Sequence, residues 1–265
     1  MDPTWAPDVD DSRHSSWLTS WTRDGYLVLP GFLSPTDLAL WGTAIDRARP
    51  LEAGPNALST DNMEFRSNLF QHSAELQAAL CQPQVVELVT TILGPDVWCR
   101  WDQAVDKGRG AGWFPWHQDN GYTQLPNVHL QLWIALTASG PENGGLLVAP
   151  GRHTELLPHV WEGGHARIDP TDPRIDQTTD GTPIAARPGD AIAFSSLLPH
   201  ATVPNTSGDD RRAYVAEFLP LNVADTTVPV PHFVVTRNGR PAPRLVDLRP
   251  AWADNLDGRM AQDTR

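Results

Sequence analysis

The pattern of the chain changes near Val97, and this change constrains the fold more than any other feature. Before it, apolar spacing and end signals indicate helices, together with one short strand-like run. After it, short apolar runs alternate with Gly, Pro and Asn turns, which is typical of strands. This order predicts an α+β fold with a mainly β core, a sandwich or barrel that carries helices on its outer face. The predicted helices cover 16–23, 34–49, 73–80 and 83–93, and the predicted strands cover 26–29, 97–105, 128–136, 146–149, 191–195 and 214–219.

The length of 265 residues suits one large domain, and we predict a single domain over 1–265. Residues 1–14 are acidic and proline-bearing, and we expect them to be loose. Residues 151–187 are rich in Pro, Asp, Gly and Thr and show little periodicity. Long stretches of this kind are often lids or binding loops, so we predict a lid or insert loop here, with a tolerated surface insertion as the alternative.

The bulk composition argues against several classes of partner. A formal net charge of −12 and a pI near 5.0 disfavour nucleic acid and anionic membranes, which leaves a small molecule as the expected partner. Cys81 and Cys99 are too few for a disulfide framework. No apolar run approaches the length of a membrane span, and the N-terminus has no apolar core for export. These features predict a soluble, cytoplasmic protein and leave its oligomeric state open.

The motif that carries chemistry is Trp116-His117-Gln118-Asp119, followed far downstream by His200. If His117 and Asp119 lie on a strand, their side chains point to the same face, because strand side chains alternate with period two. His200 follows a short buried run, at a strand end of the kind that forms the mouth of a small barrel. Two imidazoles and one carboxylate form the facial triad that holds Fe(II) and leaves positions open for oxygen and an organic co-substrate. The sequence therefore predicts a metal and catalytic site at these three residues.

Two other interpretations of the histidines stay open. A buried His117 that is hydrogen-bonded to Asp119 explains the pair without a metal. His153-Thr154-Glu155 has the same spacing of a histidine and an acid. That second pair follows a Pro-Gly turn, however, and is more typical of an exposed turn than of a buried site.

Arg211 lies where the strand after His200 begins. An arginine can bind a carboxylate through two parallel hydrogen bonds, and Thr202 can add a hydroxyl to such a site. Arg212 is the rival for this role. For both arginines the alternative is a surface side chain that balances the two aspartates at 209 and 210.

Five segments of the chain resemble the phytanoyl-CoA dioxygenase family, and they occur in that family's order and approximate spacing. The motifs are individually weak and jointly specific, and the resemblance covers roughly residues 20–220. It implies a double-stranded β-helix (jelly-roll, cupin-like) enzyme that depends on non-haem Fe(II), 2-oxoglutarate and O2. The segments are Asp24–Leu33, Trp116–Asp119, Asn143–His153, Pro188–Asp190, and His200 with Arg211.

The family's pattern also implies roles for single residues. His117, Asp119 and His200 would be the iron ligands. Arg211 would pair with the distal carboxylate of 2-oxoglutarate, with Thr202 assisting. Iron halogenases of this fold lack the carboxylate ligand, so the aspartate favours oxygen insertion or a related oxidation. The chelating end of the co-substrate would meet a polar side chain on a neighbouring strand, for which the candidates are, in order, Gln103, Gln131 and His129.

The expected reaction is hydroxylation of a C–H bond in a small organic molecule. Aromatic residues around the motif favour a ring-bearing or apolar molecule of secondary metabolism. Desaturation, epoxidation and cyclisation are alternative outcomes within the same class. Two other classes stay open, a cupin-like metal enzyme independent of 2-oxoglutarate and a non-catalytic jelly-roll binding protein. The candidate substrate contacts, chosen because they flank the proposed mouth in sequence, are Arg66, Asn68, Phe70, Trp113 and Tyr122.

Overall fold

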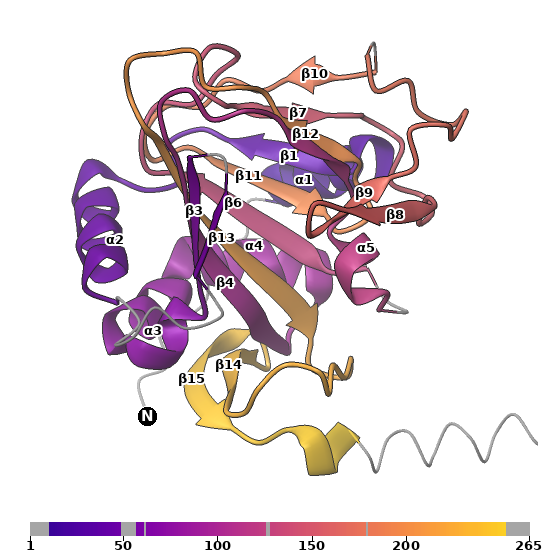
Figure 1. Cartoon of the computed structure of the whole chain (residues 1–265). Coiled ribbons are helices and arrows are strands. Elements are labelled where there is room, and N and C mark those ends of the chain that lie inside the picture. The colour runs from indigo at the N-terminus through magenta and orange to yellow at the C-terminus, as the bar shows by residue number, and fades with distance from the viewer. Residues whose placement is uncertain (1–10, 49–56, 61, 126–127, 179, 253–265) are drawn as a thin grey trace, which may run out of the picture.

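Two antiparallel sheets that face each other form the centre of the molecule, and helices cover the outer face of the larger sheet (Figure 1). The computed structural model describes residues 11–48, 57–60, 62–125, 128–178 and 180–252. This mainly β architecture with flanking helices is the one predicted. The helices are α1 (Asp11–Asp24), α2 (Pro35–Arg47), the short 3-10 helix η1 (Leu69–His72), α3 (Ala74–Leu80), α4 (Pro83–Leu93) and α5 (Asn120–Thr123).

The larger sheet has nine strands, seven of which follow the order β1-β11-β6-β13-β4-β14-β15. β13 pairs with one edge of β4 along its whole length, so β14 and β3 share the opposite edge. β2 pairs in turn with β3. These strands are β1 (Tyr26–Leu29), β2 (Ala57–Thr60), β3 (Met63–Ser67), β4 (Val97–Lys107), β6 (Leu130–Ala135), β11 (Ala191–Ser195), β13 (Arg211–Pro220), β14 (His232–Arg237) and β15 (Arg240–Val246).

The smaller sheet has the order β10-β7-β12-β5, and β8 and β9 form a separate hairpin. Apolar side chains from both sheets fill part of the space between them, among them Trp133 and Phe194 from the larger sheet and Leu146 and Val148 from the smaller one. The strands are β5 (Phe114–His117), β7 (Leu146–Val148), β8 (His159–Glu162), β9 (His165–Ile168), β10 (Thr182–Pro183) and β12 (His200–Thr202).

Side chains of the central strands alternate between the helix side and the space between the sheets, as the pleat requires. In β6, Leu130 and Leu132 pack in the helix-side core, whereas Gln131 and Trp133 point the other way. β4 departs from this alternation at Arg100, an extra residue where the pairing with β13 shifts register. Such a bulge re-aims side chains, and here both Arg100 and the residue after it face the space between the sheets.

α2 begins with the predicted serine cap. Ser34 Oγ accepts a hydrogen bond from the Asp37 amide at 3.1 Å, and proline occupies the first turn. Farther along, Trp41 is fully buried and meets the ring of Tyr214 edge-on, with centroids 5.4 Å apart. Its Nε1 donates to Gln82 Oε1 at 2.8 Å. One tryptophan therefore joins α2 to the larger sheet and to the start of α4.

The structure differs from the prediction at the N-terminus. α1 begins at Asp11, so residues 11–14 are helical rather than loose, and residues 1–10 lie outside the described residues. Tertiary contacts explain the longer helix. Arg13 pairs with Glu87 of α4, and His14 Nε2 lies 2.9 Å from Glu87 Oε1. A local sequence pattern does not reveal a partner on another helix.

Residues 151–187 also have more regular structure than their low periodicity indicated. They contain the β8–β9 hairpin, and β10 pairs with β7. β2 and β3 lie in a stretch for which the sequence predicted neither a helix nor a strand, and the pairing of the β3 backbone with β4 supports a strand of mixed polarity there. Among the described helices, none is long and apolar enough to cross a lipid bilayer. Cys81 and Cys99 are buried free thiols. The cytoplasmic location stays a prediction.

Asp102 of β4 is a carboxyl group buried in the helix-side layer. Its Oδ2 accepts hydrogen bonds from the Tyr214 hydroxyl at 2.5 Å and from the Phe70 amide at 3.0 Å. Burial raises the pKa of Asp102 from 3.8 to about 7, although these hydrogen bonds work in the opposite direction. The folded protein therefore holds this proton more tightly than the unfolded chain does.

We predict that Asp102 makes the fold more stable in mild acid than in mild base. Because its pKa is higher in the folded state, its contribution is complete below pH 3.8 and is lost as the pH rises through about 7. Asp102→Asn should therefore remove about 2–3 kcal/mol of the difference in unfolding free energy between pH 5 and pH 8. Urea unfolding of both proteins at the two pH values measures this. The same pH difference in both proteins would contradict the prediction.

Candidate metal centre and pocket

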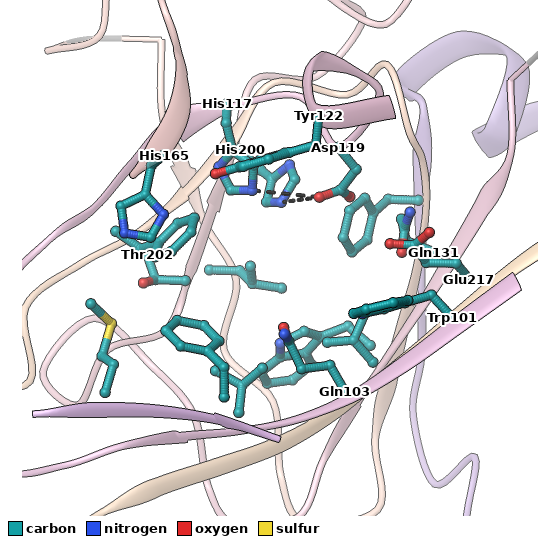
Figure 2. A pocket seen from close by; sticks show the side chains of 18 of the residues that line it. Trp101, Gln103, His117, Asp119, Tyr122, Gln131, His165, His200, Thr202 and Glu217 are labelled. Atoms are coloured by element: carbon teal, nitrogen blue, oxygen red, sulfur yellow. Dashed lines mark ion pairs between the residues drawn. The ribbon is translucent and has the colours of Figure 1, made fainter. Parts of the chain in front are cut away.

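The pairing of β5 with β12 places two histidines side by side. His117, the last residue of β5, lies directly opposite His200, the first residue of β12, and their ring centroids are 4.0 Å apart. Both Nε2 atoms point to Oδ1 of Asp119, that of His117 at 3.5 Å and that of His200 at 3.8 Å (Figure 2). Ligand atoms of the three residues lie within 4.8 Å of one another, and no other such group occurs in the described part of the chain.

The donor set fits a metal ion. His117 Nδ1 lies 2.9 Å from the carbonyl oxygen of Pro115, and His200 Nδ1 lies 3.0 Å from that of Leu198. Because a carbonyl oxygen only accepts, each Nδ1 carries the ring proton and each Nε2 keeps its lone pair for a metal. Two such nitrogens and one carboxylate on the same side are the ligands of the Fe(II) facial triad.

Asp119 reaches the site by a different route from the one predicted. β5 ends at His117, and Asp119 has helical backbone angles at the start of α5, so strand alternation does not align the pair. Gln118 between them fixes the turn instead. Its fully buried amide donates to the carbonyl oxygens of Leu197 and Glu155 and accepts from the Leu157 amide. The sequence analysis missed this role, although Gln118 stands at the centre of the motif.

Charge and burial set the protonation of the site. Burial, with repulsion from His117, lowers the pKa of His200 to about 4. Burial alone would raise the pKa of Asp119, but the neighbouring His200 and His117 outweigh it and lower that pKa. At neutral pH the site therefore offers a carboxylate and a neutral His200. These are the protonation states that bind a cation.

The triad forms part of the wall of a cavity of about 440 Å³ between the two sheets, a size typical of small-molecule sites. Most of its wall is apolar or aromatic. Figure 2 shows Gln131 and Glu217 together on one side of the cavity and Thr202 on another side, and Arg211 also belongs to the lining. The apolar and aromatic lining includes Met63, Phe65, Trp101, Val105, Phe114, Trp133, Phe194 and Val215.

Arg211 brings a buried cation to the pocket. Its side chain is 1% exposed, Nε donates to the Gly144 carbonyl oxygen at 3.2 Å, and the guanidinium lies 5.8 Å from the ring centroid of Trp133. Nη1 has no hydrogen-bond partner among the described residues, and none of their ion pairs includes Arg211. Burial lowers its pKa to about 10, so it stays charged at neutral pH. A buried, unmatched guanidinium in a cavity wall is suited to a carboxylate ligand.

The rival Arg212 points to the other side of β13. It pairs with Asp46 of α2 at 2.5 Å and with Asp106 at 3.1 Å, and it is absent from the pocket lining. Period-two alternation explains why two adjacent arginines have opposite surroundings. The structure thus brings Arg211, and not Arg212, into the cavity.

Thr202 lines the pocket on β12, and its hydroxyl oxygen accepts a hydrogen bond from Lys107 Nζ at 2.8 Å. Lys107 is the only lysine in the sequence and is fully buried. A Cβ on Gly144 would lie 2.5 Å from the Lys107 side chain, which explains the glycine. The sequence analysis missed Lys107. The signal that could have revealed it was a lone lysine just after the strand predicted over 97–105.

The three candidates for the chelating end of a co-substrate differ in position. Gln103 lines the pocket, but its Nε2 donates to Ser67 Oγ at 2.8 Å. Gln131 also lines the pocket, is 1% exposed, and has no partner for either polar atom of its amide within the described residues. His129 is fully buried behind the lining, with Nε2 3.9 Å from Glu217 Oε2. An unsatisfied buried amide makes Gln131 the strongest of the three.

A second polar group on the pocket wall consists of Arg100 and Glu217. Arg100 donates to Glu217 Oε2 at 2.7 Å and to the buried Asp225 at 2.6 Å. Two carboxylates therefore hold one guanidinium, Glu217 within the lining and Asp225 behind it, so Arg100 has no charge left to attract an anion from the cavity. Neither pocket residue was predicted, because a charged residue within a strand pattern usually marks a solvent-facing position.

Of the five predicted substrate contacts, only Tyr122 lines the pocket. Arg66 points away from it, toward the Ile45 carbonyl oxygen and Asp106, because Phe65 takes the pocket side of β3. Phe70 packs in the helix-side core, and Asn68 lies beside it before η1. Trp113 is 55% exposed outside the lining. Closeness in sequence to the motif was a poor guide here, since neighbouring residues of a strand face opposite sides.

The insert at 151–187 reaches the pocket through its hairpin. Trp161 and His165 line the cavity, and Trp161 meets the ring of Tyr122 edge-on. The predicted lid or insert loop therefore forms part of the wall. The rival histidine pair lies elsewhere. His153 packs against Gly25, and the Glu155 carboxylate pairs with Arg174.

A family model and several curated enzymes match this chain. Residues 21–213 match the family model described as phytanoyl-CoA dioxygenase (PhyH). The chain is 26% identical to a methylphosphonate hydroxylase from Gimesia maris over 221 residues, which cover 79% of this chain and 82% of the relative. It is 28% identical to an ectoine dioxygenase from Nocardia farcinica over 274 residues, which cover 92% of this chain and 86% of the relative.

Among solved structures, the chain is similar to the epimerase SnoN in complex with Fe3+, alpha ketoglutarate and nogalamycin RO. The TM-score is 0.66 at 17% identity, over 88% of this chain and 96% of that one. At this identity the likeness concerns the fold, and it confirms the predicted double-stranded β-helix. The family model itself covers well over half of the chain. The chain therefore belongs to the phytanoyl-CoA dioxygenase family of non-haem Fe(II)- and 2-oxoglutarate-dependent oxygenases.

Proposed function

We propose that this oxygenase hydroxylates a C–H bond of a small, ring-bearing organic molecule, with His117, Asp119 and His200 as its iron ligands. The observation that carries the proposal is the convergence of both Nε2 atoms on one oxygen of Asp119 in the wall of a cavity. Desaturation, epoxidation and cyclisation use the same centre, and product analysis separates them from hydroxylation.

Bound Fe(II), 2-oxoglutarate and O2 would supply the oxidant, with one oxygen atom entering succinate as carbon dioxide leaves and the other entering the substrate C–H bond. The chain's own residues hold and orient these partners. The carbonyl oxygens of Pro115 and Leu198 fix the two imidazole rings. The aromatic wall, including Phe114 and Tyr122 beside His117, keeps bulk water from the centre.

The co-substrate would lie between the triad and Arg211. The buried guanidinium offers its free Nη1 to the distal carboxylate, and the Thr202 hydroxyl lies in the same part of the wall. The end of 2-oxoglutarate that chelates the metal would meet Gln131, whose side-chain amide has no partner among the described residues. Gln103 ranks second because its amide already donates to Ser67. We do not propose His129 as a contact of 2-oxoglutarate, because it does not belong to the cavity lining.

The substrate would take the remaining space, between Trp101, Tyr122 and the Arg100–Glu217 pair. Aromatic side chains there suit a ring. Two carboxylates already hold Arg100, so this wall does not favour a phosphonate or a coenzyme A ester. A neutral or cationic ring-bearing molecule fits better. The structural similarity to SnoN, described as part of nogalamycin biosynthesis, supports a substrate from secondary metabolism.

A turnover screen tests this function. The protein, loaded anaerobically with Fe(II), is supplied with O2, 2-oxoglutarate and a library of small metabolites, and succinate and product masses are followed. We expect some ring-bearing compounds to stimulate succinate formation and to gain one oxygen atom. Loss of two hydrogens without oxygen gain would reassign the outcome to desaturation or cyclisation. Stimulation by anionic phosphonates alone would contradict the proposed substrate class.

We predict that Asp119→Ala abolishes substrate-stimulated succinate formation and strongly weakens Fe(II) binding, because the metal loses its only anionic protein ligand. Anaerobic titration with Fe(II) measures the binding. Glu155→Ala is the matched control, since it removes the carboxylate of the other His-x-acid pair, and it should leave both properties unchanged. An Asp119→Ala protein with full activity would refute the assignment.

We predict that Arg211→Met raises the KM for 2-oxoglutarate by about 10- to 100-fold, the loss expected for hydrogen bonds to a charged group. Arg212→Met is the control, because that side chain binds Asp46 and Asp106 outside the cavity. Its KM for 2-oxoglutarate should change little. A larger rise for the Arg212 variant would transfer the role to Arg212.

A further inference from the structure

We propose that Glu217 selects the substrate, and that the substrate carries a protonated amine whose N–H groups donate to this carboxylate. The inference deepens the proposed function and rests on it. It concerns the part of the cavity wall that would face the substrate, away from Arg211 and Thr202. Glu217 would take no part in the oxidation itself and would decide which molecules bind beside the metal centre.

Cross-strand pairing places Glu217 at the centre of a row of three side chains. Glu217 of β13 lies directly opposite Trp101 of β4 on one side and Gln131 of β6 on the other. Residues paired in this way point to the same face of a sheet, and all three line the cavity. Figure 2 shows them along one side of it. The carboxylate therefore lies between an indole ring and an amide.

The contacts of Glu217 leave one of its two oxygens for a ligand. Arg100 donates to Oε2 at 2.7 Å, and His129 Nε2 lies 3.9 Å from that same oxygen. Among the described residues no hydrogen bond reaches Oε1, although the side chain is only 15% exposed. A ligand that displaces water from Oε1 without donating to it would leave a charged acceptor unsatisfied, which is costly. The cavity therefore favours a donor at this place.

Gln131 adds a second acceptor beside the first. Its side chain is 1% exposed, and neither Nε2 nor Oε1 has a partner among the described residues. The chelating end of 2-oxoglutarate offers only acceptors, so it can bind the Nε2 hydrogens of this amide but not its oxygen. The Gln131 Oε1 atom then still lacks a donor. Two neighbouring acceptors without donors call for a group that only donates.

A protonated amine matches this wall better than other polar groups do. It has donors and no acceptor, and its charge is opposite to that of the carboxylate. An aliphatic amine is protonated at neutral pH, as the lysine side chain is. The Trp101 ring beside Glu217 suits the carbon atoms next to the nitrogen, and an aromatic face attracts a cation. A hydroxyl brings one donor without charge, and an anion would find Arg100 already held by Glu217 and Asp225.

Binding of matched ring-bearing amines tests the proposal. The probes are 2-phenylethylamine and larger ring-bearing amines, each as the free amine, as its N-acetyl amide and as its trimethylammonium derivative. The amide loses the charge, whereas the trimethylammonium group keeps the charge and loses the donors. Calorimetry measures their binding to protein loaded with Zn(II) and 2-oxoglutarate. We expect the free amine to bind about 10- to 100-fold more tightly than its amide, and more tightly than its trimethylammonium derivative.

The variant Glu217→Gln assigns this preference to one residue. It removes the charge and keeps an oxygen that can accept from Arg100. We expect it to weaken binding of the amine by about 10- to 100-fold and to leave binding of the amide unchanged. Glu142→Gln is the matched control, because that exposed carboxylate does not line the cavity, and it should change neither. The comparison of probes on the unmodified protein needs no variant and still tests the proposal if Glu217→Gln fails to fold.

The possible outcomes separate this inference from the proposed function. Equal affinity for amine and amide, or no binding of any amine, would overturn the inference. Equal weakening of both probes by Glu217→Gln would show a structural role and would overturn it too. Tighter binding of the trimethylammonium derivative would overturn the part that concerns donated hydrogen bonds. Failure of the protein to bind 2-oxoglutarate would instead contradict the proposed function.

Discussion

The site depends on one backbone pairing, that of β5 with β12. It sets His117 opposite His200, although the two are far apart in the sequence, and the carbonyl oxygens of Pro115 and Leu198 then turn both rings the same way. The two buried imidazole nitrogens both face one carboxylate oxygen, an arrangement that a cation between them would stabilise. The arrangement persists because the two sheets hold the strands in place, and this preorganisation is what a metal ion needs.

Charge divides the cavity into two regions. On one side the buried Arg211 brings a cation without an ion-pair partner among the described residues, whereas on the other wall Arg100 is held by Glu217 and by Asp225 behind the lining. Buried charges are expensive unless each meets an opposite charge, so each region selects its ligand by sign as well as by shape. The dicarboxylate co-substrate and the proposed substrate without negative groups would therefore occupy different parts of the cavity.

The sequence predicted the architecture, and it singled out the three residues whose ligand atoms the structure brings together, because helix caps, apolar periodicity and a specific motif are local signals. Ser34 caps α2 as expected, and β1, β11 and α4 have the predicted bounds. The sequence did not predict the features that depend on contacts with residues far away along the chain. α1 is extended by contacts with α4, and the β8–β9 hairpin gains its order from pairing and packing that its composition hides.

The same distinction explains why the chemistry was easier to predict than the substrate. The residues proposed to contact the metal and the co-substrate lie at strand ends or beside glycines whose backbone positions tolerate few alternatives, as Gly144 shows. The wall proposed to contact the substrate comes from a bulge at Arg100, from α5 and from the hairpin that carries Trp161. A hairpin beyond the sheets can change its side chains without disturbing the triad. Specificity within this family can therefore diverge while the reaction stays the same.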